Sequence, residues 1–258
     1  MHSTSGACAP PPAGAPREGR ADRLARRLGL SRASLALLRL EVDARLARWR
    51  AGAWPPDRRR LARIRAARGL LVNVGCGPFP LDGFVNLDIR AFTPGVVVWD
   101  CRRTLPVADG ACAGIRIEHF VEHTDPRDEL PRLLEDCHRA LAPGGVLRIV
   151  VPDTERYLLA YAAGGRAAFH AIGVPDPFPA DLPTRMDVVN HAFHQWHEHR
   201  WGYDEETLRH RLGAAGFGEV VRMGFGRSRL PALAADRDEH RPYSLYVDAV
   251  KRGEAHPA

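Results

Sequence analysis

From residue 70 onward, short apolar runs alternate with longer stretches of helical period. Seven runs read as strands, at 70–74, 84–88, 96–100, 114–118, 146–151, 219–223 and 244–250. Apolar residues recur at helical spacing over 126–141, 154–169 and 204–215, with Asp204 placed to cap the last helix. Runs that are mostly apolar are typical of parallel strands covered on both sides. The pattern predicts a Rossmann-like, doubly wound, mostly parallel seven-stranded sheet with helices on both faces.

The first 68 residues have a different pattern. Residues 1–20 are rich in Pro, Ala and Gly and predict a disordered tail. Residues 21–68 form a basic helical extension, in which leucines recur three or four apart with arginines between them. We expect a helical hairpin that breaks near 29–31, with Ser31 capping the second helix, and then a short helix from Pro55 to about residue 67. The arginines should fill the polar face while the helices pack on the main domain at 69–252.

Charge and composition narrow the classes of protein. Residues 1–70 hold 16 arginines and only five acidic residues, so the net charge of +6 belongs to the extension. Its arginines are interleaved with Trp49 and Trp54, which leaves a nucleic-acid or membrane-surface patch as an alternative to a solvated face. No apolar run is long enough to span a membrane, no secretory signal pattern opens the chain, and the five cysteines lack CxxC spacing. These features favour the cytoplasm.

The loop after the first strand is the first candidate for chemistry. It reads Asn73-Val74-Gly75-Cys76-Gly77, and its two glycines would let a ligand touch the main chain. Asp88 ends the second apolar run, where its carboxylate could accept both hydroxyls of a ribose. Asp100 ends the third run, where it or the Cys101 backbone could meet an adenine edge.

The segment after the loop argues against a dinucleotide such as NAD or FAD. Only six residues, 78–83, separate Gly77 from the next strand, and they include two prolines. No full helix fits there, so no helix N-terminus is available for a pyrophosphate. A cofactor whose tail is an amino acid removes this difficulty.

At this point the sequence resembles the class I methyltransferases that use S-adenosyl-L-methionine, in particular their compact type 11 branch with a shortened first helix. The resemblance spans residues 70 to 251 and rests on the order of six segments: VNVGCG, FVNLDI, LPVADGACAGIRIEHFVEH, LLEDCHRALAPGGVLRIVVPD, YDEETLRHRLGAAGF and SLYVDAVK. In it, the Pro143-Gly144-Gly145 segment would be a structural turn into the fifth strand.

The resemblance implies roles at matching positions. Asn73 stands where many members have an acidic residue that places the methionine part, so it can hydrogen-bond but brings no charge. The other implied cofactor contacts are Gly75, Cys76 and Gly77 under the amino-acid end, Asp88 on the ribose, Ile89 against the adenine, Asp100 and Cys101 at the adenine amine, and Glu118 and His119 at the end of the fourth strand.

Methyl transfer is an in-line displacement that depends mainly on alignment, and it needs a general base only for an acceptor proton of high pKa. His119 and His123 are the candidate catalytic bases, although a packing or helix-capping role is favoured for each. Residues 171–202 show no period and should form an insertion that covers the site and selects the acceptor. Its histidines 191, 194, 197 and 199 could line the acceptor pocket, lie on a surface loop or, least favoured, bind a metal; we expect no metal.

The function that these features favour is methylation of an O or N atom on a small molecule or a sugar-containing precursor such as a glycan precursor. Two alternatives stay open. One is an RNA-directed methyltransferase that uses the basic extension, with nucleic acid as a less favoured partner. The other is a cofactor-binding module without catalysis.

Overall fold

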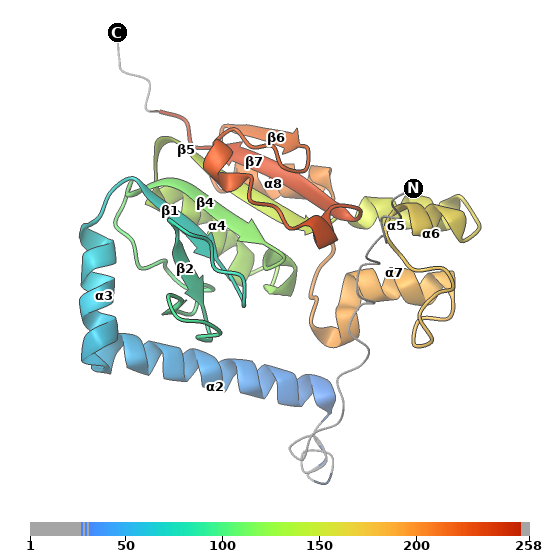
Figure 1. The fold of residues 1–258 in the computed structure, drawn as a ribbon, viewed down its shortest axis with the longest axis horizontal. Coiled ribbons are helices and arrows are strands. Elements are labelled where there is room, and N and C mark those ends of the chain that lie inside the picture. Colours follow the sequence, from blue (N-terminus) through green and yellow to red (C-terminus); the bar gives the residue numbers. More distant parts are fainter. Residues whose placement is uncertain (1–26, 28, 30, 254–258) are drawn as a thin grey trace, which may run out of the picture.

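The computed structural model describes residues 27, 29 and 31–253. Seven strands form one sheet in the order β3-β2-β1-β4-β5-β7-β6 (Figure 1). Their bounds are Leu70–Val74 (β1), Val85–Asp88 (β2), Val97–Val98 (β3), Cys112–Glu118 (β4), Leu141–Pro152 (β5), Glu219–Met223 (β6) and Ser244–Val250 (β7). Only β7 runs antiparallel to its neighbours, β5 and β6. The predicted Rossmann-like, mostly parallel seven-stranded sheet is therefore confirmed.

The α-helices lie before β1 and in the connections from β4 to β5 and from β5 to β6. They are α2 (Arg32–Ala53), α3 (Pro55–Ala66), α4 (Glu129–Ala140), α5 (Thr154–Ala162), α6 (Ala167–Ala171), α7 (Arg185–His194) and α8 (Glu205–Ala214), with 3-10 turns η1 (Val121–His123), η2 (Gln195–His197), η3 (Pro231–Leu233) and η4 (Asp238–His240). The predicted caps are confirmed. Ser31 accepts a hydrogen bond from the backbone of Ser34, and Asp204 does the same for Thr207.

Three local predictions are wrong. The helix expected over 154–169 is two helices, because Gly164 and Gly165 both take left-handed backbone angles between α5 and α6. The stretch 171–202, expected to be irregular, contains α7, which begins with a capping box between Thr184 and Asp187. The Pro143–Gly145 segment is a bulge inside β5, since Leu141 pairs with Cys112 and Val146 with Gly114.

One face of the sheet is apolar and is covered by α4 and α8 (Figure 1). Side chains that point to this face are fully buried, among them Val72, Val74, Ile115, Ile117, Leu147 and Ile149. The helices contribute leucines at helical spacing, including Leu130 and Leu134 on α4. This layer is the main hydrophobic core.

The opposite face carries a row of polar side chains that crosses five strands. The register places Asn86, Asn73, Arg116, Arg148 and Asp248 next to one another, from β2 through β7. All five are buried. The segment 224–243, with η3 and η4, covers part of this row and supplies Asp236 as a partner for Arg148.

The helical extension packs on the main domain, as expected. Figure 1 shows α2 running past the edge of the sheet toward which β1 and β2 point. Three ion pairs fix it there: Arg48 with Asp100 at 3.2 Å, Asp43 with Arg90 at 2.6 Å, and Glu41 with Arg102 at 2.8 Å.

The expected polar outer face of this extension is wrong for α2. Ala44 and Ala47 are buried against the domain, whereas the large apolar residues of the helix face outward, namely Leu37, Leu38, Val42, Leu46 and Trp49. The predicted tail 1–20 and the first helix of the hairpin lie outside the described residues, apart from positions 27 and 29. No helix in the described part of the chain has the length and apolar character needed to cross a membrane.

Candidate cofactor and acceptor site

The glycine loop follows β1 at the carboxyl edge of the sheet. Gly75 and Gly77 both take left-handed φ angles, 66° and 53°. A side chain on Gly75 would collide with the ring of Phe120, whereas the space beside Gly77 is open. The loop therefore requires glycine at Gly75 for packing, and it leaves open space beside the half-buried backbone of Gly77.

Asp88 lies where the sequence predicts it, beside this loop. Its Oδ2 accepts a hydrogen bond of 2.9 Å from the Gly77 amide, and its Oδ1 accepts one from the Arg90 amide at 3.0 Å. Burial raises the pKa of Asp88 above its usual range, while these backbone amides act in the opposite direction. The carboxylate thus joins the ends of β1 and β2, with half-buried Ile89 next to it.

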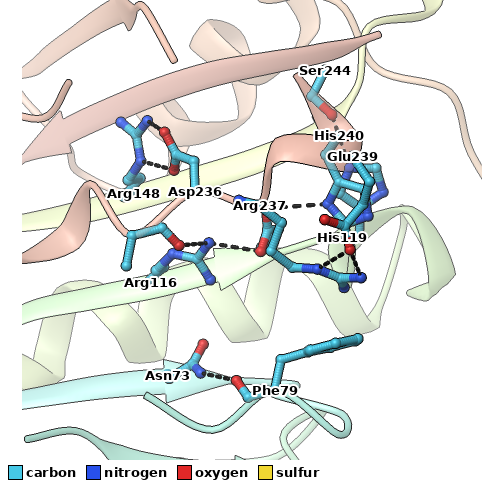
Figure 2. A network of polar contacts seen from close by, with 12 residues as sticks. Asn73, Phe79, Arg116, His119, Arg148, Asp236, Arg237, Glu239, His240 and Ser244 are labelled. Carbon is cyan, nitrogen blue, oxygen red and sulfur yellow. Dashed lines mark hydrogen bonds and ion pairs between the residues drawn. The ribbon is translucent and has the colours of Figure 1, made fainter. Parts of the chain in front are cut away.

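Asn73 holds the short segment that replaces a helix after the loop. Its side-chain amide donates to Asn86 Oδ1 at 3.0 Å. It also donates to the carbonyl of Phe79 at 3.4 Å (Figure 2). Asn86 in turn accepts from the Leu81 amide at 2.8 Å. These contacts give Asn73 a structural role beneath the loop.

Asp100 and Cys101 follow β3. The Asp100 carboxylate is nearly fully buried and pairs with Arg102 at 2.9 Å and with Arg48 from the extension. Both carboxylate oxygens of Asp100 are therefore paired with arginines of the chain itself. Cys101 is buried beside the same edge, and burial raises the pKa of its thiol.

The end of β4 lies next to the glycine loop, since Ile117 pairs with Val74. Glu118 is buried and bonds Arg116 at 2.6 Å and His240 Nδ1 at 3.2 Å. Burial alone would raise the pKa of Glu118, but the His240 hydrogen bond and the charge of Arg116 lower it to about 2. Glu118 is thus held as a carboxylate by side chains of its own chain.

His119 has an unusual backbone for a residue other than glycine, with φ at 49°. Its Nε2 lies 2.9 Å from Ser244 Oγ, and its ring packs 3.8 Å from that of His240 (Figure 2). Its Nδ1 lies 3.2 Å from Glu122 Oε1. Both ring nitrogens are therefore engaged within the chain.

A compact cluster follows directly, formed by Glu122, His123 and His199. Their candidate ligand atoms all lie within 4.8 Å of one another. Burial alone would raise the pKa of Glu122, but a hydrogen bond from His119 and the charges of His119 and His123 lower it to about 2. Burial lowers the pKa of His199 to about 4, so its imidazole is neutral at physiological pH.

The structure separates the histidines that the sequence groups together. Of positions 191, 194, 197 and 199, only His199 joins the cluster around Glu122. Sequence reasoning missed Glu122, His240 and Ser244. The repeated Glu-His pair, 118–119 and 122–123, is a signal that could have indicated Glu122. Nothing local indicates the partners from the C-terminal segment.

No family model matches the chain, and no curated protein matches it. Solved structures that are similar include a SAM-dependent methyltransferase from Archaeoglobus fulgidus, 18% identical, which covers 90% of this chain and 100% of that chain with a TM-score of 0.45. A SAM-dependent methyltransferase from Methanosarcina mazei is 14% identical, with 76% and 98% covered and a TM-score of 0.44. An S-adenosylmethionine-dependent methyltransferase from Mesorhizobium loti is 18% identical, with 76% and 96% covered and a TM-score of 0.41. At such low identities and TM-scores, this likeness says nothing of what the chain acts on.

Proposed function

We propose that the chain is a methyltransferase that uses S-adenosyl-L-methionine and methylates an O or N atom of a small molecule or sugar-containing precursor. The observation that carries this proposal is the position of Asp88, whose carboxylate lies against an open glycine backbone at Gly77. The segment between Gly77 and β2 has no helix to receive a pyrophosphate. This arrangement suits a nucleoside joined to an amino acid.

The residues present fit such a group. Asp88 would accept the ribose hydroxyls and Ile89 would pack on the adenine, while the backbone of 75–77 would run beneath the amino-acid end. When bound, the cofactor supplies a methyl group on a sulfonium sulfur. Because Arg48 and Arg102 engage the Asp100 side chain, only the backbone at Asp100 and Cys101 would meet the adenine.

The acceptor should lie near the end of β4. A groove of about 520 Å³ opens between α2 and the segment after α7, and its lining includes Leu37, Pro126, Arg200 and Trp201. This groove supports the proposal that the 171–202 segment helps to select the acceptor. The chain's contribution to catalysis is alignment, with His119 and His123 as candidates for proton transfer where the acceptor requires it.

The test is the binding of S-adenosylhomocysteine, measured by calorimetry. Asp88→Ala should weaken binding by about 1–3 kcal/mol, because charge-assisted hydrogen bonds to the ribose are lost. Asp82→Ala, an exposed carboxylate in the neighbouring loop, is the matched control and should bind normally. An unchanged dissociation constant in Asp88→Ala would refute the ribose assignment. Binding without turnover on any O or N acceptor would favour the non-catalytic module.

A second candidate, methyl transfer to RNA, is favoured by one observation. Helix α3 presents Arg58, Arg59, Arg63 and Arg65 on its exposed side. If RNA is the acceptor, its affinity should fall steeply with salt, and changing these four arginines to glutamine should flatten that dependence. Affinity that does not respond to either change would exclude this candidate.

A further inference from the structure

The Glu122 side chain is the most unusual buried group in the described structure. It is buried, and apart from His119 Nδ1 no described residue offers a hydrogen-bond donor to its carboxylate oxygens. The contact with His119 Nδ1 at 3.2 Å is an ion pair only when that histidine is protonated. A buried carboxylate with a single neighbouring donor is costly to fold, so a cation at this site would stabilise it.

The two histidines beside Glu122 are oriented by the backbone. His123 Nδ1 lies 3.0 Å from the carbonyl oxygen of Glu198, and His199 Nδ1 lies 2.9 Å from that of Ala192. A carbonyl can only accept, so Nδ1 carries the proton in each ring. The Nε2 atoms are therefore left with free lone pairs, which is the arrangement that outer-shell carbonyls give to metal-binding histidines.

The chain enters this site through a strained segment. Gln195, Trp196 and His197 take left-handed φ angles of 34°, 56° and 78° in succession. None is glycine, so each conformation has an energetic cost that surrounding contacts must offset. The Arg200 amide then donates to the backbone carbonyl of Glu122 at 2.7 Å. The left-handed turn at 195–197 and this hydrogen bond together place His199 beside Glu122, although the two residues are far apart in the sequence.

We propose that Glu122, His123 and His199 bind one divalent transition-metal ion. Two imidazoles and a carboxylate favour Zn²⁺, Mn²⁺ or Fe²⁺ over Ca²⁺ and Mg²⁺, which prefer oxygen ligands. The ligand atoms lie up to 4.8 Å apart, so small side-chain rotations would close them onto bonds of about 2.0–2.2 Å. The inference replaces the sequence expectation of no metal and makes His123 a ligand instead of a base.

The position of the site suggests that the ion would bind and orient the acceptor. Three protein ligands leave coordination positions open, as in metal sites that bind substrate. Glu122 lies four residues beyond the end of β4, close to where the acceptor should bind. An oxygen atom of the acceptor, such as a hydroxyl, would complete the coordination and be oriented by the ion. This last step rests on the proposed function; metal binding itself does not.

Metal binding can be tested without cofactor or acceptor. The full chain, stripped with a chelator and dialysed, is titrated separately with ZnCl₂ and MnCl₂, and bound metal is measured by mass spectrometry. We expect roughly one ion per chain and a rise in melting temperature on binding. His199→Ala and Glu122→Gln each remove a ligand and should lower the affinity by more than the roughly 10–100-fold that follows loss of an outer-shell partner. His210→Ala on α8, an exposed histidine away from the cluster, is the matched control and should bind as the unaltered chain does.

The outcomes separate the two proposals. If the unaltered chain binds neither ion, or if both cluster variants bind as well as His210→Ala does, the metal site is refuted. The unaltered chain decides this even where a variant fails to fold, and His123→Gln, at a half-buried position, offers a milder change. S-adenosylhomocysteine calorimetry on the same metal-free protein reports on the cofactor alone, so either proposal can fail while the other stands.

Discussion

The two faces of the sheet are stabilised in different ways. The face beneath α4 and α8 is a continuous apolar layer whose members come from regularly spaced positions. The opposite face buries a row of amides and charges, in which Arg148 meets Asp236 at 2.6 Å and Asp248 at 2.8 Å with all three side chains fully buried. The first face needs only apolar residues of suitable size, whereas the second needs particular partners in fixed positions.

This difference determines what each face tolerates. An apolar layer loses transfer free energy and packing when a side chain is shortened. A buried ion pair has little net stabilising effect compared with an apolar replacement, yet losing one partner leaves a charge without compensation. The polar face should therefore be more sensitive to single changes and more sensitive to pH.

The largest effect is expected from Arg148→Met. It leaves Asp236 and Asp248 buried without their cation and should lower the free energy of unfolding by about 3–5 kcal/mol, as measured by urea denaturation. The variant Arg148→Met with Asp236→Asn and Asp248→Asn removes all three charges and should recover part of this loss. A single variant as stable as the unaltered chain would contradict the contrast between the faces.

A smaller effect is expected from Leu134→Ala on α4. The side chain is 1% exposed, so the cavity should cost about 2–5 kcal/mol in the same measurement. Leu159→Ala on α5, where the side chain is 62% exposed, should stay within about 0.5 kcal/mol. Equal losses in the two variants would mean that the apolar layer is not the main core.

The smallest effect, and the one that depends on pH, is expected from Glu118→Gln. Near neutral pH the change should cost about 1–3 kcal/mol, because Arg116 loses a charged partner. The pKa of Glu118 is lowered from 4.5 to about 2, so its stabilising effect is present above 4.5 and is lost as the pH falls toward 2. The difference between the variant and the unaltered chain should shrink over that range, while the Leu134→Ala difference stays constant. A Glu118→Gln difference that is constant with pH would contradict this assignment.

The sequence predicts the apolar face well, because period and run length are local signals. It predicts the seven strands, the caps at Ser31 and Asp204, and the proximity of Asp88 to the glycine loop. It misses α7, whose start depends on a capping box within a segment rich in proline and aromatic residues.

The polar side of the site could not be predicted in the same way. Arg148 and Asp248 are 100 residues apart in the chain, and His199 reaches Glu122 only through the strained backbone after α7. The strand pattern gives a position for each side chain but does not say which distant segment covers it. For this reason the histidines at 191–199 look like one group in the sequence, whereas in the structure only His199 lies beside Glu122.

The ion pairs of α2 have a consequence for how this protein can be divided. Arg48 and Arg102 share the buried carboxylate of Asp100, and Arg102 also bonds Glu129 on α4. The extension, the end of β3 and α4 therefore form one charge network. Recombination that exchanged the chain at residue 69 would separate Asp100 from Arg48, so the segment that can be inherited as a unit includes α2 as well as the sheet.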